Sequence, residues 1–191
     1  MSAPRGITLF ELLVVTVIFA VVAGAVSLAS YSHRTSYLST ETKVYLQQQA
    51  RQALSEMERE LRQAGGTIAT AANQITFQMN LGYDQAAPCP ANAVCWGARD
   101  EAGANQSGWS VRYRLNGTQL VRELVNGAGV LQAGTHVLAN DVTVLQFIYV
   151  GGTTRTATVQ LQVQRFSSLL PGGGLAVAPT PLVSRVKLRN N

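Results

Sequence analysis

An uninterrupted apolar run near the N-terminus constrains this chain more than any other feature. From Leu12 to Ala29, eighteen consecutive residues carry no charge, and the apolar stretch begins at Ile7 if Glu11 is included. That length is the threshold for a helix that crosses the hydrocarbon core of a bilayer. We therefore expect one membrane-spanning helix at the start of the chain.

A removed secretory signal peptide is the main alternative, because Arg5 supplies a basic region ahead of an apolar one. Three features oppose it: the basic leader is only six residues long, the apolar run exceeds an ordinary signal-peptide core, and Glu11 interrupts its start. The small residues Ser27, Ala29 and Ser30 are followed by helix formers rather than by a turn. We therefore favour a retained helix.

A second helical pattern follows. Residues 40–64 contain no proline or glycine, and strong helix formers dominate. Apolar residues at spacings of three and four form one narrow stripe: Leu46, Ala50, Ala53, Leu54, Met57, Leu61 and Ala64. On the opposite side, Glu58 and Arg62 are spaced for an i,i+4 ion pair. We expect Gly65 and Gly66 to stop the helix.

The two patterns can belong to one helix, since no proline occurs between Ile7 and Gly66. Such a helix would hold up to 58 residues. Its length would be on the order of 85 Å. Its first half belongs in lipid, and its second half packs on the rest of the chain. We expect Gly24 to be its weak point.

The pattern changes after Gly66, where most of the 17 glycines lie and short strands alternate with turns. Asn116-Gly117 separates the alternating segments 110–115 and 118–124 and fits a two-residue type I′ hairpin. The faces of this hairpin are predicted to be Val111, Tyr113, Leu115 and Leu120 on one side, and Arg112, Arg114, Gln119 and Glu123 on the other.

A second predicted hairpin pairs residues 142–150 with 156–164 across Gly151-Gly152. The first of these segments is apolar on both faces, which predicts a central strand. Residues 182–189 alternate again, after a Gly/Pro loop over 171–181. The helix stripe is the only amphipathic cover available for the apolar face of the sheet. We therefore predict an α+β fold, in which a long N-terminal helix packs by its C-terminal half on a small antiparallel β-sheet head.

Composition excludes several other classes. An apolar fraction of 47 % argues against a disordered chain. His33 and His136 lie about a hundred residues apart and the chain has two cysteines, so no dense metal cluster is expected. No G-x-S-x-G, H-E-x-x-H or Walker A pattern occurs, and no spacing supports a triad of His136, Asp141 and a serine. We expect His136 in a loop, and no catalytic residue, metal or cofactor.

Residues 6–13, Gly-Ile-Thr-Leu-Phe-Glu-Leu-Leu, follow Arg5 and open the apolar helix, and they resemble the type IV prepilin processing motif. The resemblance implies that a prepilin peptidase cuts after Gly6 on the cytoplasmic side and methylates the new amine of Ile7. The usual first mature residue of the family is Phe. The implied organisation is a cleaved leader (1–6), a transmembrane and assembly half of the helix (7–33), an amphipathic half (34–65) and a β-rich head (66–191).

Downstream segments extend the resemblance to minor pilins of the PilW type and minor pseudopilins of the GspJ type. These segments are 54–65, 138–142, 145–149 and 185–190. The resemblance implies a non-enzymatic minor pilin that takes part in type IV pilus assembly or initiation, in motility, adhesion or DNA uptake. A minor pseudopilin of a type II secretion system is the alternative. A membrane-anchored enzyme or binding module is a more distant one.

The same resemblance implies partners and a location. The partners are other pilins or pseudopilins through the N-terminal helix, the prepilin peptidase, the inner-membrane assembly platform and the lipid bilayer. The location is the inner (cytoplasmic) membrane, as a single-pass protein with its head in the periplasm, and then a pilus or pseudopilus. DNA is a further candidate ligand, since Arg112, Arg114 and Arg122 could form a basic patch. Because Arg112 and Arg114 lie on a solvated face near Glu123, we expect no specific contact with DNA.

Glu11 needs a physical reason, since a carboxylate in a membrane helix costs roughly 2.5–3.5 kcal/mol on insertion scales. One interpretation is an interfacial residue that reaches the lipid headgroups. The interpretation that the resemblance favours is a salt bridge to the free N-terminal amine of a neighbouring subunit, created by cleavage after Gly6. Such a pair would set the axial register between helices.

Cys89 and Cys95 enclose the segment Pro-Ala-Asn-Ala-Val. A head exported to an oxidising compartment would carry a disulfide here rather than two thiols. Closing this loop is worth roughly 2 kcal/mol in the chain-entropy model. A redox pair usually has the closer C-x-x-C spacing. We therefore expect a structural disulfide that fixes a surface loop.

Overall fold

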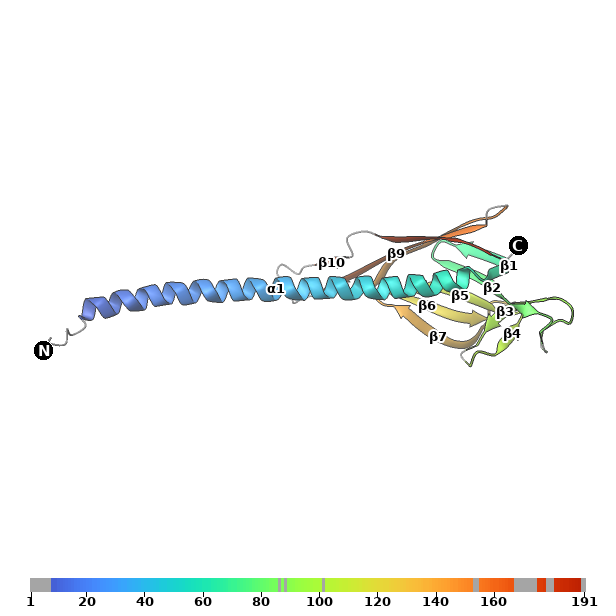
Figure 1. The fold of residues 1–191 in the computed structure, drawn as a ribbon, viewed down its shortest axis with the longest axis horizontal. Helices are drawn as coiled ribbons and strands as arrows, with labels where there is room; N and C mark the ends of the chain where they lie inside the picture. The colour runs from blue at the N-terminus through green and yellow to red at the C-terminus, as the bar shows by residue number, and fades with distance from the viewer. Residues whose placement is uncertain are drawn as a thin grey trace.

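The computed structural model describes residues 8–85, 87, 89–100, 102–152, 155–166, 175–177 and 181–189. Its first element is α1 (Leu9–Leu61), a single helix of 53 residues. The helix passes through Gly24 without interruption, so the weak point expected there does not break it. Figure 1 shows the N-terminal half of α1 projecting away from the head, while the C-terminal half lies along it.

The helix ends three residues earlier than the sequence predicts. The chain enters β1 (Ala64–Ala71), which pairs antiparallel with β2 (Gln74–Tyr83). Gly65 and Gly66, expected to stop the helix, therefore lie inside a strand. The backbone N–H of Asn80 donates to the carbonyl of Gln63 at 3.0 Å. Pairing with β2 therefore begins at Gln63, before the two glycines. Gly66 then adopts a φ of +59°, which suits glycine.

Two antiparallel sheets form the described part of the head. The first has the strand order β4-β3-β2-β5-β6-β7, with β1 also on β2, and the second is built on β9. The remaining strands of the first sheet are β3 (Val94–Arg99), β4 (Asn105–Ser107), β5 (Ser110–Asn116), β6 (Gln119–Val125) and β7 (Leu131–Ala139). The second sheet contains β8 (Val142–Val150), β9 (Thr156–Phe166), β10 (Leu175–Val177) and β11 (Leu182–Lys187).

The C-terminal half of α1 packs into one hydrophobic core that it shares with both sheets. The predicted stripe is confirmed from Leu46 to Leu61, where its six residues are at most 7 % exposed. The seventh, Ala64, is buried but lies in β1. The first sheet contributes Phe77 and Tyr113 to this core, and the second contributes Val159 and Leu161. In Figure 1 the helix lies between β9 on one side and β7 on the other. The α+β architecture expected from the sequence is therefore present.

The first predicted hairpin forms, but its turn is shifted by one residue. Asn116 pairs with Gln119, so the two turn residues are Gly117 and Thr118. Gly117 has a φ of +61° and Thr118 does not have a positive φ, which is the type II′ pattern with glycine first. Of the predicted core-facing residues, Val111, Tyr113 and Leu120 are buried, and Leu115 is half-buried against the core.

The observed register is explained by the side chains that it brings together. It pairs Arg112 with Glu123 and Val111 with Leu124, whereas the predicted turn would have placed Arg112 opposite Val121. Cross-strand pairs of opposite charge and pairs of aliphatic side chains stabilise antiparallel strands. Pairing along the strands therefore outweighs the turn preference of Asn116-Gly117.

The second predicted hairpin is confirmed as β8 and β9, but the position of β8 in the sheet is not as expected. Its sole strand partner in the described part of the chain is β9, so β8 is an edge strand, and β9 is central between β8 and β11. The outward side chains of β8, Val144, Ile148 and Val150, are 37–51 % exposed. The prediction of a central strand was wrong, because β8 has one strand neighbour and the described part of the head leaves its second apolar face exposed.

A short strand replaces part of the expected Gly/Pro loop over 171–181. Residues 175–177 form β10 by pairing with residues 164–166 of β9. Pro181 is described as the residue that precedes β11. Residues 171–174 and 178–180 of this loop lie outside the described residues.

Candidate functional site: the N-terminal helix and its anchorage

The first part of α1 is apolar and lies outside the packed head. The segment Leu9–Tyr31 is 23 residues long, and none of its most apolar window is buried within the structure. At 1.5 Å per residue it spans about 34 Å, which is enough to cross the hydrocarbon core of a bilayer. Such a surface needs lipid or the helices of other proteins around it. By length and composition, it is the one membrane-spanning candidate among the described residues.

Glu11 lies in the first turn of this helix. Thr8 is the N-cap residue, and its hydroxyl oxygen accepts a hydrogen bond from the backbone N–H of Glu11 at 3.3 Å. The Thr-x-x-Glu spacing is that of a capping box, a signal in the sequence that the prediction of Glu11 as an assembly residue did not use. The cap uses the backbone of Glu11. Its carboxylate is exposed and makes no ion pair among the described residues.

The predicted cleavage site lies just before this cap. Gly6 and Ile7 fall outside the described residues, so the described geometry of the N-terminus begins at Thr8. The negative charge of Glu11 is favourably placed at the start of a helix, where the backbone N–H groups are unpaired.

The C-terminal half of α1 carries Glu60, whose carboxylate is paired inside the head, unlike the exposed carboxylate of Glu11. Glu60 accepts a hydrogen bond from the Tyr113 hydroxyl at 2.5 Å and from Nε of Arg122 at 3.1 Å. Glu60 and Arg122 also form an ion pair at 3.1 Å. Burial, together with the neighbouring Glu60 carboxylate, raises the pKa of Tyr113 well above its ordinary value. This network joins the helix to β5 and β6 across the core.

Two further contacts hold the same half of the helix. The Glu58 carboxylate accepts a hydrogen bond from the Ser184 hydroxyl of β11. It also forms the predicted i,i+4 ion pair with Arg62 at 3.4 Å. Gln49 accepts a hydrogen bond from the backbone N–H of Asn140 at 3.2 Å. The C-terminal half is thus bonded to both sheets and to the loop that joins them.

The three arginines of the predicted basic patch do not form one patch. Arg112 and Arg114 converge on Glu123, at 2.6 Å and 2.8 Å, on the outer side of the first sheet. Arg122 points to the helix instead, where it meets Glu60. Glu123 is 1 % exposed, so its position on a solvated face was wrong. The hydrogen bond from Arg114 lowers the pKa of Glu123, and Arg112 acts in the same direction.

Cys89 and Cys95 form a disulfide in the structure. Cys95 is fully buried in β3, opposite Gly82 of β2. The loop between the cysteines is also held by Asp84, whose carboxylate accepts from the backbone N–H of Asn92 at 2.8 Å. The disulfide therefore fixes the connection between β2 and β3 to the start of β3.

A cavity of about 670 Å³ lies between the helix and the first sheet, where Glu60, Arg122 and His136 meet. His136 belongs to β7 and pairs with Arg122, so the expectation of a loop residue was wrong. Glu60 and Arg122 are already paired with each other. No serine, threonine, cysteine or lysine lines this cavity within the described residues. Those residues also contain no cluster of three acidic, histidine or cysteine side chains placed to hold a metal.

Comparison with known proteins gives one positive result, over the N-terminal segment. Residues 1–27 match the prokaryotic N-terminal methylation motif. A search of curated proteins finds no match. Proteins with this motif are structural subunits rather than enzymes, and the motif implies prepilin peptidase processing and association with other pilins. This motif, the apolar helix that follows it and the antiparallel sheets of the head together support a type IV prepilin-like protein.

Proposed function

We propose that the chain is a non-enzymatic minor pilin that takes part in the assembly of a type IV pilus. The observation that carries this proposal is the apolar helix Leu9–Tyr31, which the head leaves uncovered and which begins with a carboxylate in its first turn. A tether would need only apolar residues. The helix start compensates part of this charge, but in lipid a full charge calls for a cation, and the described residues offer none.

That partner is the N-terminal amine of a neighbouring subunit. Cleavage after Gly6 would create a free amine at Ile7, four residues before Glu11 in the sequence. A carboxylate of one helix and an amine of the next would neutralise each other in a medium where either alone is costly. The capping bond supports this role, since it occupies the backbone of Glu11 and leaves both carboxylate oxygens available.

The processed chain is a single-pass protein of the inner membrane, with residues 7–33 in the bilayer or the filament core. Two features support this orientation. Arg5 lies on the N-terminal side of the span, where the positive-inside rule places the cytoplasm. The Cys89–Cys95 disulfide lies in the head, and disulfides persist in the periplasm rather than the cytosol. Other pilins, the prepilin peptidase and the assembly platform are its partners.

Mass spectrometry of the mature N-terminus tests this proposal. The chain purified from membranes should begin at Ile7 with a methylated amine and lack residues 1–6. Gly6→Ala should still be processed, because the side chain remains small, whereas Gly6→Leu should leave the uncut precursor. A native chain that starts at Met1 or near Ser30 would show that the proposal is wrong.

A further inference from the structure

One cavity of the head brings charged side chains of both signs together. It is the cavity of about 670 Å³ between α1 and the first sheet, whose charged lining residues come from α1, from β6 and from the end of β3. Cavities of this size with a few convergent polar groups are where small molecules bind. Met79 supplies the one apolar side chain among the described lining residues, and it is 5 % exposed. A ligand of this cavity would therefore be small and polar.

Two of the carboxylates in this cavity are already held by the fold. Glu60 is paired with Arg122 at 3.1 Å. One carboxylate oxygen of Asp100 accepts from the backbone N–H of Ala104 at 2.8 Å, and the other accepts from the side-chain amide of Gln106 at 2.9 Å. These groups shape the cavity, and the recognition of a ligand is left to the remaining charges.

Three charged groups of the lining form no ion pair among the described residues. Arg59, in the last turn of α1, and Arg99, at the end of β3, are both exposed. Glu56, one turn before Glu60, is half-buried. The helix dipole favours a cation in the last turn of a helix, so it accounts for Arg59 but not for Arg99. Two guanidinium groups and one carboxylate are thus available to a ligand.

The charges of these three groups define the complementary ligand. With His136 counted as neutral, they sum to a single positive charge. An acidic amino acid carries two carboxylates and one ammonium, so it offers the opposite charge to each of the three groups. A guanidinium binds a carboxylate through two parallel hydrogen bonds, and the Glu56 carboxylate can accept from the ammonium. No aromatic side chain is among the described lining residues, so the cavity offers no surface for a ring.

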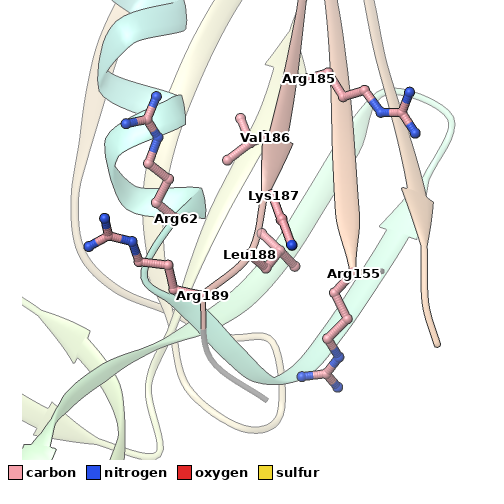
Figure 2. A pocket seen from close by; sticks show the side chains of 7 residues that line it. All are labelled: Arg62, Arg155, Arg185, Val186, Lys187, Leu188 and Arg189. Carbon is pink, nitrogen blue, oxygen red and sulfur yellow. The ribbon is translucent and has the colours of Figure 1, made fainter. Parts of the chain in front are cut away.

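A second cavity, of about 650 Å³ near the C-terminal end of α1, lacks this arrangement. Its charged lining residues are all basic, and no carboxylate is among the lining residues that the structure describes. Figure 2 shows Arg62 and Arg189 on one side of β11 and Arg185 on the other, so these side chains do not converge. Because it offers no acceptor for an ammonium, this second cavity serves as an internal control.

We propose that the cavity between α1 and the first sheet binds an acidic amino acid. Its two carboxylates bind Arg59 and Arg99, and its ammonium binds Glu56. Such a ligand links the last turns of α1 to β3 of the first sheet. The site lies at the other end of α1 from Glu11, so its failure would leave the proposed minor pilin function untouched.

Isothermal titration calorimetry tests the site, with the full chain in micelles of an uncharged detergent and L-glutamate as the probe. One molecule of glutamate should bind per chain. Glutarate, which lacks the ammonium, and L-glutamine, which lacks one carboxylate, should each bind about tenfold more weakly, because each loses one charge-assisted interaction. Arg59→Gln and Arg99→Gln should each weaken glutamate binding by about the same factor.

Glu56→Gln separates recognition of the ammonium from recognition of the carboxylates. It should weaken glutamate binding about tenfold and should not weaken glutarate binding, because glutarate has no group that Glu56 binds. The preference of the chain for glutamate over glutarate should therefore disappear. A preference that survives Glu56→Gln would overturn the assignment of the ammonium to Glu56.

Two matched controls each remove one exposed arginine outside this cavity: Arg51→Gln on α1 and Arg185→Gln in the second cavity. Both should bind glutamate like the unaltered chain. Weakening equal to that of Arg59→Gln would overturn the proposal, because net charge alone would then explain binding. Equal binding of glutamate and glutarate by the unaltered chain, or no saturable heat up to about 10 mM glutamate, would also overturn it. Unaltered tryptophan fluorescence will show that each variant is folded.

Discussion

The two halves of α1 have the same backbone conformation but opposite surroundings. The C-terminal half buries its stripe, from Leu46 to Leu61, in a core formed by both sheets. The N-terminal half, Leu9–Tyr31, carries larger apolar side chains, and the described residues of the chain bury none of them. One half therefore serves folding, and the partners of the other half lie outside the molecule.

The carboxylates of the two halves also differ in their surroundings. Glu60 has a tyrosine hydroxyl and a guanidinium as partners, and its side chain is 13 % exposed. Glu11 has a backbone cap and an exposed carboxylate without an ion pair among the described residues. A carboxylate that stabilises the fold and a carboxylate that acts between molecules should respond differently to removal. The variants below test this difference, and tryptophan fluorescence follows the head, since Trp96 and Trp109 are the two tryptophans.

Removing the Glu60 carboxylate should have the largest effect on the head. Glu60→Ala leaves Arg122 and the Tyr113 hydroxyl without their partner inside the fold, and breaking a buried pair in this way costs about 3–5 kcal/mol. Urea unfolding of the detergent-solubilised chain measures the loss. Glu56→Ala, one turn earlier on the same helix, is the matched control and should change stability by less than about 0.5 kcal/mol. Equal losses for both variants would contradict the assigned role of Glu60.

A leucine-to-alanine substitution in each half of α1 should give the next largest effect on head stability. Leu61 is fully buried, so Leu61→Ala should lower the free energy of unfolding of the head by about 2–5 kcal/mol. Leu12 is 59 % exposed, so Leu12→Ala should leave it unchanged. Urea titrations of the two variants make the comparison. A loss of head stability in Leu12→Ala would show that the N-terminal half belongs to the folding unit.

The sequence predicted α1 better than it predicted the sheets, and the reason is periodicity. A stripe at spacings of three and four has one interpretation, and its members from Leu46 to Leu61 are all buried. In β8 both faces are apolar, and alternation cannot tell whether the same chain covers the second face. The central position predicted for β8 was wrong for that reason. Ile148 and Val150 are exposed, so the described residues of the head cover one face of β8 and not the other.

The site shows the same limit. The capping box of Thr8 and Glu11 and the ion pair of Glu58 and Arg62 are local and can be seen in the sequence. The pairing of Glu60 with Arg122 joins residues 62 positions apart, and no spacing rule finds it. The alternating pattern of residues 118–124 predicted that Glu123 is exposed to solvent. In the structure Arg112 and Arg114 cover it. Contacts between distant segments depend on the register of β5 and β6. The Asn116-Gly117 signal predicted the turn of this hairpin one residue too early, so the predicted register was wrong.

Removing the disulfide extends the comparison to the loop between β2 and β3, which belongs to neither half of the helix. Cys89→Ala/Cys95→Ala should lower head stability by roughly 2 kcal/mol, because the reduced chain is less constrained when unfolded. The membrane helix should be unaffected. Alkylation before reduction, followed by intact-mass measurement, should find both cysteines blocked in the native chain. Two readily alkylated thiols would contradict the disulfide.

The pH dependence of Glu123 gives the smallest effect on stability. Its pKa is lowered in the folded head, so the unfolded chain binds the proton more readily as the pH falls. The stabilisation is therefore present above the ordinary glutamate pKa of about 4.3 and is lost as the pH falls below it. Glu123→Gln should cost about 1–2 kcal/mol at pH 7 and less at pH 3. A cost that does not shrink on acidification would mean that the ion pairs do not stabilise the head.

The central claim is that Glu11 acts between subunits, and crosslinking of the chain to other pilins in native membranes tests it most directly. Glu11→Val should insert at least as well, since a costly charge is removed, and its head should unfold at the same urea concentration. Crosslinks should fall at least tenfold, while Glu41→Val, on the same helix outside the span, should retain them. Crosslinks at the unaltered level in Glu11→Val would contradict the account, because the helix would then be only a tether.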